Sequence, residues 1–421
     1  MFKFDFSGED ISDTEADVPV PSSNGEPVST TTTTTTAADA SKGSEFKVDT
    51  EIHDIRDLLQ SLPSRMSYSL LSVSSTSDLA QSSKLRIPRR EVFDIKVQIM
   101  ADEDLLPSIS EETTTKTETA ADNTTQFRKK ELQILLSNTE DLRTDLYEGG
   151  LKSWEGAGDL TEFLADTGVE VGKGVLELGC GSALPSIYLF QEYIRTLLTA
   201  TPEQQQQQQQ QQYPPVSFIM SDYNYAVLRL MTAPNFLLAY HNVRNSLSTP
   251  TSSSDDPSQP TQTSDLDLEV TPDLVSQFFE FLDTHNISIK LISGPWNSSS
   301  FADFLGYSPA STSNSTSPTE KLPFSLVLGS ETIYSVASTN AFIPILLDSV
   351  SLWNTERETA LLPTAYVAAK EIYFGVGGTA RQFIEDTEKA GGKVKVVKRI
   401  ASGRSSGVAR VIIQTTAGSK D

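Results

Sequence analysis

The residues whose types and spacing could do chemistry begin in the run VLELGCG at positions 175–181. A short apolar strand there carries Glu177 near its end and leads into a turn made of Gly179, Cys180 and Gly181. Glycine permits the sharp bend of such a turn and lets a bulky ligand approach the backbone closely. The helix expected next would direct its N-terminus toward that ligand. An ordinary turn between a strand and a helix is the alternative interpretation.

The spacing of the glycines indicates which ligand would fit. A dinucleotide-binding fingerprint requires a third glycine three residues after Gly181, and Leu184 occupies that position. A cradle for phosphates is therefore disfavoured. An acidic strand end with only two close glycines suits a zwitterionic ligand without phosphates, such as S-adenosylmethionine.

Polar and aromatic residues also follow the later predicted strands. In an open sheet of parallel strands, ligands bind outside the carboxyl ends of the strands. The second strand ends with Asp222, Tyr223 and Asn224, the third with Gly294, Pro295 and Trp296, the fourth with Ser330, Glu331 and Tyr334, and the fifth with KEIYFGVGG at 370–378. We expect Asp222 to accept hydrogen bonds from both ribose hydroxyls of the ligand, and Trp296 to stack on an adenine ring.

Several of these residues also have a plainer interpretation. Asp222 could be the N-cap of the next helix, and Trp296 could be an ordinary core residue. Tyr334 could pack under the helix that follows it. Trp154, in the run YEGGLKSWE at 147–155, could cover the cofactor pocket or the edge of the sheet. Because polar or aromatic groups end five successive strands, a binding site is favoured over these separate explanations.

A sheet must position these residues, and the pattern from about residue 130 predicts one. Strands are predicted at 174–178, 216–221, 287–292, 324–328, 364–369, 393–399 and 407–415, and helices at 183–198, 226–241, 341–350 and 379–389. Strands that alternate with helices indicate a mostly parallel sheet covered on both faces. The last two strands are close enough in sequence for a hairpin, which is antiparallel. The predicted fold class is therefore α/β: a doubly wound, seven-stranded, mostly parallel sheet with one antiparallel hairpin strand.

The chain outside this pattern is rich in polar, low-complexity sequence. Residues 1–127 are predicted to be a largely disordered extension before a domain at 128–421. Two segments in the extension, 52–62 and 89–104, have apolar residues at helical spacing and could dock on the core or on a partner. Disordered insertions are predicted near 201–214, which contains a polyglutamine tract, near 247–263 and near 308–320.

Composition excludes several classes of function. The net charge is −23, from 56 Asp and Glu against 33 Lys and Arg, so direct binding to nucleic acid is not expected. The single cysteine, Cys180, permits no disulfide within the chain and fits an intracellular protein. The three histidines do not pair at ligand spacing, so no metal site is expected. No apolar run reaches the length of a membrane span.

Together, these runs resemble the seven-β-strand S-adenosylmethionine-dependent methyltransferases and, more narrowly, the histidine protein methyltransferase family. The similar runs are YEGGLKSWE at 147–155, LELGCGSALP at 176–185, DYN at 222–224, SGPW at 293–296, LGSETIY at 328–334 and KEIYFGVGG at 370–378. The combination of YEGGLK-WE, SETIY and YFGVGG is specific, whereas LELGCG alone would not be. The resemblance covers roughly residues 128–416 apart from the insertions.

The resemblance implies a Rossmann-like methyltransferase fold and S-adenosylmethionine as cofactor. It places residues 177–181, 222–224 and 293–296 at the cofactor, and Trp154, Glu155 and residues 330–334, with Ser330, Glu331 and Tyr334 as the catalytic candidates, between cofactor and substrate. The implied substrate is one histidine of a large-subunit ribosomal protein, which implies a location in the cytoplasm and nucleus, including the nucleolus. We expect a monomer.

Two other functions stay open on the sequence. The acid-x-x-Tyr form of residues 331–334 also occurs in related protein-lysine methyltransferases, so that run does not separate a histidine target from a lysine target. A non-catalytic scaffold that binds the cofactor is the other alternative. A histidine target with a pKa of about 6.5 is largely neutral near pH 7, whereas a lysine at about 10.4 must first lose a proton.

Overall fold

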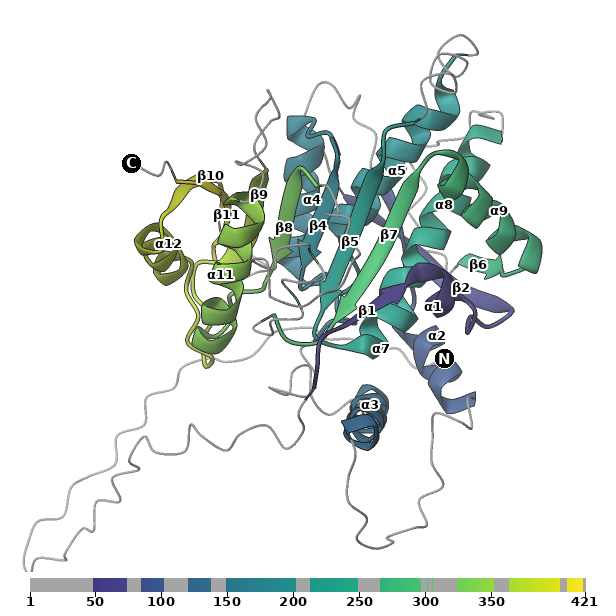
Figure 1. Ribbon diagram of the computed structural model, residues 1–421, viewed down its shortest axis with the longest axis horizontal. Helices are drawn as coiled ribbons and strands as arrows, with labels where there is room; N and C mark the ends of the chain where they lie inside the picture. The colour runs from purple at the N-terminus through teal and green to yellow at the C-terminus, as the bar shows by residue number, and fades with distance from the viewer. Residues whose placement is uncertain are drawn as a thin grey trace, which may run out of the picture. The chain divides into compact units, whose positions relative to one another are not determined.

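The computed structural model describes residues 48–73, 85–101, 120–137, 149–201, 213–248, 266–296, 301, 305, 324–351, 363–401 and 407–418 (Figure 1). All of them belong to one compact unit that spans Phe46–Asp421. The predicted extension before residue 48 and most of the three predicted insertions lie outside the described residues.

An eight-stranded sheet forms the centre of this unit, in the order β1-β7-β5-β4-β8-β9-β11-β10. Its strands are β1 (Glu51–Asp54), β4 (Gly174–Leu178), β5 (Val216–Asp222), β7 (Ile287–Ser293), β8 (Leu326–Ser330), β9 (Thr364–Lys370), β10 (Gly392–Ile400) and β11 (Arg410–Ala417). Strands β7, β5, β4, β8 and β9 are parallel to one another, and β11 is antiparallel to both β9 and β10. The predicted seven-stranded α/β sheet with an antiparallel hairpin strand is confirmed, and β1 adds an antiparallel edge strand beside β7.

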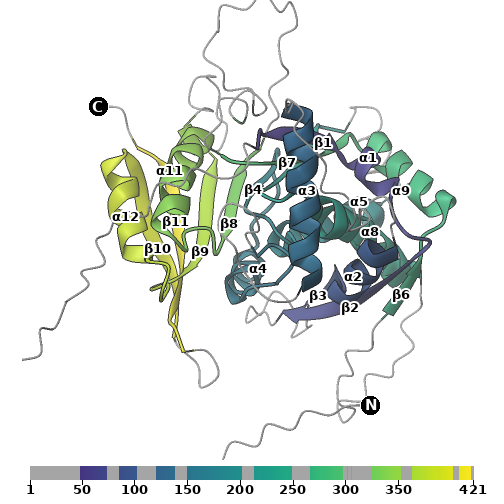
Figure 2. The same ribbon diagram turned by 90° about the horizontal axis from the view of Figure 1, so that it is seen from below.

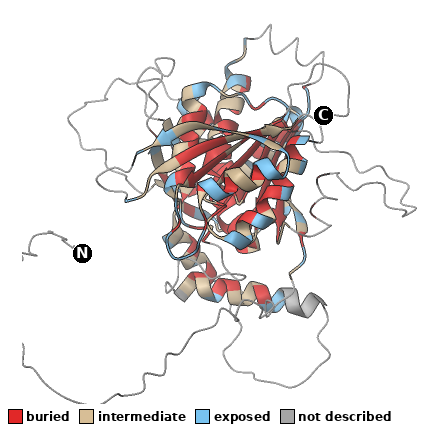
Figure 3. Ribbon diagram, turned by 90° about the vertical axis from the view of Figure 1, so that its left-hand side faces the viewer, coloured by how far each residue is buried: buried red, intermediate tan, exposed pale blue. Residues whose placement is uncertain are grey.

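Helices cover both faces of the sheet, because the central strands are apolar on both sides. Val175 packs with α4 (Glu155–Thr167), α5 (Leu184–Thr199), α8 (Ala233–Ser248) and α9 (Pro272–Thr284). Its neighbour Leu176 packs on the other face with α11 (Val336–Ser351) and α12 (Ala380–Lys389). Figure 2 shows the two groups of helices, and Figure 3 shows the buried strands between them. The sheet is therefore doubly wound. One of the covering helices, α9, was not predicted from the sequence.

A second, antiparallel sheet was not predicted. It has the order β3-β2-β6 and consists of β2 (Arg65–Val73), β3 (Leu85–Arg90) and β6 (Leu266–Glu269). The helix expected at 52–62 is wrong in its first part, where residues pair with β7 as strand β1; only α1 (Ile55–Leu59) is helical. Pairing with an open sheet edge outweighs a short helical period, because isolated helices of this length are marginal in water.

The segment before residue 128 therefore contributes to the folded unit. The helix expected at 89–104 is present as α2 (Val92–Ala101), shortened because Arg89 and Arg90 belong to β3. Arg90 is fully buried, and it donates hydrogen bonds to the Asp94 carboxylate and to the carbonyl of Leu230. A further helix, α3 (Ala120–Ser137), contacts α2 and α7 (Tyr225–Val227). The folded part thus begins well before residue 128, because buried anchors such as Arg90 leave little trace in composition.

Candidate functional site

A cavity of about 280 Å³ lies where the carboxyl ends of the parallel strands meet. Its walls come from residues within five segments: 149–154 with Ala157, 179–182, 222–223, 294–296, and 330–341, where Val336 is not part of the wall. The first segment precedes α4 (Glu155–Thr167), and the others follow β4, β5, β7 and β8; β4 and β8 flank the point where the strand order reverses. That position is where open α/β sheets bind ligands.

Most of the predicted site residues line this cavity. They are Trp154, Gly179, Cys180, Gly181, Asp222, Tyr223, Gly294, Pro295, Trp296, Ser330, Glu331 and Tyr334. Glu155, Glu177 and Asn224, which were also predicted at the site, are not among the residues that line this cavity. The parallel strands bring these distant residues together because their carboxyl ends share one edge of the sheet.

The glycine turn after β4 is held by Asp222. Gly181 has a φ of 51°, and its backbone N–H donates to Oδ2 of Asp222 over 2.9 Å. Oδ1 of Asp222 accepts from the N–H of Asn224, and Asn224, not Asp222, is the N-cap of α7. A Cβ on Gly181 would lie 2.9 Å from the carbonyl oxygen of Gly150, so this glycine permits the close approach of two backbone segments.

Glu177 supports the site from beneath. It is fully buried, and its Oε2 accepts hydrogen bonds from the backbone and hydroxyl of Ser186, in the first turn of α5. Its Oε1 has no hydrogen-bond partner among the described residues. Burial raises the pKa of Glu177 to about 8, although Ser186 favours the charged form. The side chain therefore fixes the helix against the strand and does not reach the cavity.

Glu131 on α3 is a buried acid behind the β5 turn that the sequence analysis missed. It is fully buried, and its Oε1 accepts from the N–H of Ala226 over 3.1 Å. Burial raises the pKa of Glu131 to about 8, with a hydrogen bond from Ala226 acting in the opposite direction. The side chain of Asn224 also bonds to it, which explains why Asn224 faces α3 and not the cavity. In the sequence, the only sign that Glu131 is buried is its place in a run whose apolar residues recur at helical spacing.

Two tryptophans form aromatic walls. Trp296 donates from Nε1 to the Ser221 hydroxyl over 3.0 Å and packs on Phe342 with ring centres 5.5 Å apart. It therefore belongs both to the core and to the cavity wall. Two lysine ammonium groups lie near the ring of Trp154: that of Lys152 is 4.5 Å from the ring centre and that of Lys370 is 5.3 Å from it. Trp154 thus lines the cavity and carries cations near its ring.

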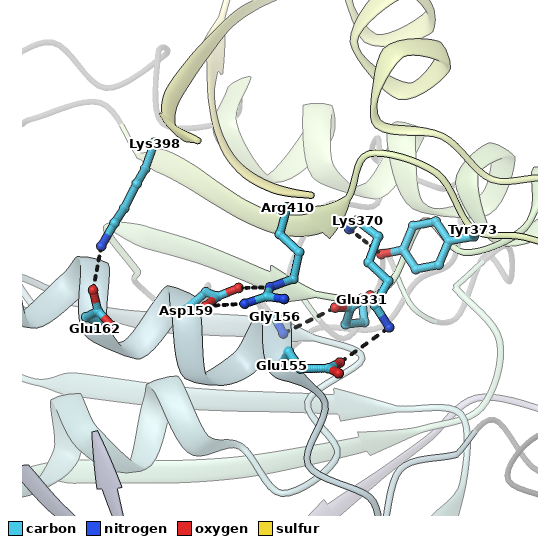
Figure 4. A network of polar contacts seen from close by, with 9 residues as sticks. All are labelled: Glu155, Gly156, Asp159, Glu162, Glu331, Lys370, Tyr373, Lys398 and Arg410. Carbon is cyan, nitrogen blue, oxygen red and sulfur yellow. Dashed lines mark hydrogen bonds and ion pairs between the residues drawn. The ribbon is translucent and has the colours of Figure 1, made fainter. Parts of the chain in front are cut away.

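Glu331 is held in an unusual backbone conformation at the end of β8. Its φ is 57°, and its N–H donates to the carbonyl of Ala368 over 2.9 Å. Oε1 accepts from the N–H of Gly156 over 3.2 Å, while Oε2 has no partner by geometry among the described residues (Figure 4). A non-glycine residue with positive φ is strained and marks a position that the surrounding structure over-determines.

The surroundings of Glu331 set its charge. Burial raises the pKa of Glu331 above its ordinary value, and a hydrogen bond from Tyr373 and the Lys370 ammonium partly offset this. The Tyr373 hydroxyl itself accepts from the N–H of Lys370 over 3.1 Å. The Lys370 ammonium lies 3.3 Å from the Glu155 carboxylate, which explains why Glu155 is outside the cavity (Figure 4).

Tyr334 lies next to the loop that follows β9. Its carbonyl accepts from the N–H of Gly378 over 3.0 Å, and Ser335 forms a β-bridge with Gly377. Tyr334 is half-buried, packs against the core cluster that includes Phe342 and also lines the cavity. Its predicted contact with the substrate stays a prediction.

The wall of the cavity suits a ligand that carries positive charge and donates hydrogen bonds. Glu331 and Asp222 place two carboxylates in the wall, and Oγ1 of Thr332 and Oε2 of Glu331 are buried acceptors without geometric partners in the described part of the chain. Such acceptors are stabilised by a ligand that donates hydrogen bonds. No cluster of residues that could hold a metal ion occurs among the described residues. Within the same ranges, no helix is both long and apolar enough to cross a membrane.

Comparison with known proteins identifies relatives along most of the chain. The chain is 32% identical over 342 residues to histidine protein methyltransferase 1 of Saccharomyces cerevisiae, covering 80% of this chain and 76% of that protein. It is 27% identical over 362 residues to histidine protein methyltransferase 1 of Schizosaccharomyces pombe, covering 83% of this chain and 80% of the relative. No protein-family model matches the chain.

Among solved structures, the methyltransferase domain of bacterial CtHen1 is similar at 14% sequence identity and a TM-score of 0.29. The aligned part covers 62% of this chain and 97% of that one. The strand order described above, and not this likeness, assigns the fold.

Proposed function

The chain belongs to the histidine protein methyltransferase 1 family, and on that premise we propose that it methylates a histidine of a large-subunit ribosomal protein. As a member of this family it is an S-adenosylmethionine-dependent protein-histidine N-methyltransferase. The observation that carries the assignment to a site is the cavity at the carboxyl ends of β4, β5 and β8, with Glu331 in its wall. Membership of this family argues against the two alternatives, a protein-lysine methyltransferase and a non-catalytic scaffold that binds the cofactor.

The cavity residues divide into two groups in this proposal. Gly179, Gly181, Asp222 and Trp296 would hold the cofactor, because they belong to the turns and the aromatic wall at the ends of β4, β5 and β7. Ser330, Glu331 and Tyr334, at the end of β8, would face the substrate. S-adenosylmethionine, when bound, supplies a methyl group on a sulfonium, and this leaving group is already activated.

The chemistry left to the protein is orientation and charge. One ring nitrogen of the neutral target histidine would accept the methyl group that the cofactor supplies, and the ring would then release the proton of its other nitrogen to solvent. An acceptor for the N–H of the other ring nitrogen selects the tautomer. Glu331 is suited to this because its residue lines the cavity at the end of β8 and its side chain is an acceptor. Its carboxylate would also stabilise the positive charge that develops on the ring.

The net charge supports a basic protein as substrate. With a net charge of −23, this chain attracts strongly basic proteins and repels free nucleic acid. Ribosomal proteins are basic, which makes them suited to such a field. We extend the proposal to a monomeric enzyme that acts in the cytoplasm and nucleus, including the nucleolus, where these proteins are made and assembled.

A methylation assay tests the substrate class directly. Large-subunit ribosomal proteins from cells that lack this protein are incubated with the purified enzyme and labelled cofactor, and the modified residue is mapped by mass spectrometry. Methyl-histidine at one position in one basic protein is expected. No label in any of these proteins would refute the ribosomal substrate, and methyl-lysine as the product would refute the assignment of the target ring.

A further inference from the structure

Four exposed apolar side chains lie beside the candidate site. They are Val336, 59% exposed, Ile372, 47% exposed, Phe374, 77% exposed, and Val376, 44% exposed; we call them the apolar rim. A phenylalanine exposed to this extent costs solvation free energy, and a cluster of such side chains on a soluble protein marks a surface that binds another molecule.

The loop that carries the rim is held in place. The N–H of Tyr373 donates to the carbonyl of Gly378 over 2.9 Å, and Ile372 forms a β-bridge with Thr379. A Cβ on Gly378 would lie 2.1 Å from the carbonyl oxygen of Ile333, so the loop packs directly on the backbone after β8. Three of the rim residues, Ile372, Phe374 and Val376, are therefore exposed on a loop whose backbone is held in place, and Val336 is exposed at the start of α11.

The same loop separates an inward from an outward aromatic residue. Tyr373 is buried and its hydroxyl contacts Glu331, whereas Phe374, next in sequence, points outward. Gly375 and Gly377 have φ values of 83° and 87°, and no described atom lies within 4 Å of a Cβ built on either glycine. The backbone between the rim residues is thus open, with room for a polypeptide to approach.

The rim is continuous with the cavity wall. Val336 lies in sequence between Ser335 and Ala337, which both line the cavity, and Ser335 pairs with Gly377 of the loop. A histidine side chain is short, so a ring beside Glu331 requires the substrate backbone to lie at the mouth of the cavity. The neighbouring residues, about 3.8 Å away from Cα to Cα, must then cross the surface around that mouth.

We propose that the apolar rim binds the substrate protein itself, by accepting an apolar side chain next to the target histidine. The inference rests on protein-histidine methylation as the function and adds the chemistry of substrate recognition. Because the rim is outside the cavity, it would contribute to binding of the protein substrate and not to binding of the cofactor or to the methyl-transfer step.

Kinetic comparison of rim variants tests this proposal. Phe374→Ser and Val376→Ser remove apolar area, Phe374→Leu retains it, and Phe93→Ser is the matched control, because Phe93 is 74% exposed on α2. With extracted large-subunit ribosomal proteins as methyl acceptors, each serine variant of the rim should raise KM about tenfold, with kcat and cofactor affinity within about twofold of wild type. Phe374→Leu and Phe93→Ser should behave as wild type. An unchanged KM in both rim variants would overturn the proposal.

A second measurement does not depend on the ribosomal substrate. Short synthetic peptides with one central histidine are compared when flanked by leucine or by serine. Wild type should methylate the leucine-flanked set at least fivefold faster at low peptide concentration, and Phe374→Ser should lose most of this preference. Equal rates for the two peptide sets with wild type would refute the binding of a flanking apolar side chain by the rim. Failure of ribosomal proteins to be labelled would count only against the proposed substrate.

Discussion

The backbone N–H of Gly181 donates a 2.9 Å hydrogen bond to Oδ2 of Asp222, which joins the turn after β4 to the end of β5. The other carboxylate oxygen accepts from the N–H of Asn224 over 3.0 Å. One side chain therefore organises both turns that line the cavity. A buried carboxylate with two backbone donors is a strong constraint, because charge-assisted hydrogen bonds are stronger than neutral ones.

Removing the Asp222 carboxylate should weaken cofactor binding. Asp222→Ala leaves the N–H of Gly181 without its acceptor, so we expect a loss of about 1–3 kcal/mol in S-adenosylmethionine affinity, roughly 5- to 150-fold in Kd. Asp222→Asn keeps an acceptor and should lose less. Isothermal titration calorimetry measures both, with Asp283→Ala as control, because Asp283 forms an exposed ion pair with Arg56. Unchanged affinity in Asp222→Ala would contradict this role.

Loss of the charge at Glu331 should affect the chemical step. Glu331→Gln keeps an oxygen for the N–H of Gly156 but cannot stabilise a positive ring, so kcat should fall about 100-fold or more. Cofactor affinity should change by less than about twofold. Glu155→Gln is the control, since Glu155 lies outside the cavity and pairs with Lys370. Equal losses of kcat in the two variants would show that Glu331 has no special role.

The rate of methyl transfer should rise with pH and then level off. The target imidazole must be neutral, with a pKa of about 6.5, and Glu331 must be ionised. Burial raises the pKa of Glu331 above its ordinary value, so loss of its charge contributes to the fall in rate on the acid side. Single-turnover rates across pH 5–10 measure this, and Glu331→Gln should show the shallower rise. A rate still climbing above about pH 9 would indicate a lysine target instead.

Stability should fall as the pH rises through the range of two buried acids. Burial raises the pKa of Glu131 and of Glu177 to about 8 in the folded protein, above their ordinary value. The folded state then holds more protons than the unfolded state, so the stabilisation is complete below the unfolded pKa of about 4.3 and is lost as pH rises through about 8.

Glutamine variants test whether these two acids cause the decline of stability with pH. Glu177→Gln and Glu131→Gln remove the ionisation while keeping an oxygen acceptor, so each should flatten the decline of Tm between about pH 5 and pH 9. Glu192→Gln, in a surface pair with Arg195, should leave the decline unchanged. Differential scanning calorimetry measures Tm, and a wild-type Tm that rises over this range would be evidence against buried, protonated acids.

Arg90 should be essential to the folded unit. Arg90→Met leaves Asp94 without its buried partner and frees the carbonyl of Leu230, so we expect a loss of about 3 kcal/mol in the free energy of unfolding. Arg86→Met on the exposed side of the same strand is the control. Urea denaturation measures both, and a change below about 1 kcal/mol for Arg90→Met would show that the segment around β3 is dispensable.

The sequence by itself determined the architecture and most of the cavity wall. Alternating apolar strands and helices specify a doubly wound sheet, because each strand must be covered on both faces. Residues that follow parallel strands necessarily meet at one edge, so Gly181, Asp222, Trp296 and Glu331 could be brought together from strand ends alone. The run of motifs then identified the family that the relatives confirm.

Only the tertiary structure decided which polar groups face the ligand. Glu177 and Asn224 come from the same runs as Gly181 and Asp222, yet Glu177 accepts hydrogen bonds from Ser186 and Asn224 donates to the buried carboxylate of Glu131. The place of Arg90 and of strand β1 depends on partners more than a hundred residues away in the chain. A linear pattern records period and residue type, whereas the direction of a side chain and the pairing of an edge strand depend on whichever distant groups need a partner in the folded protein.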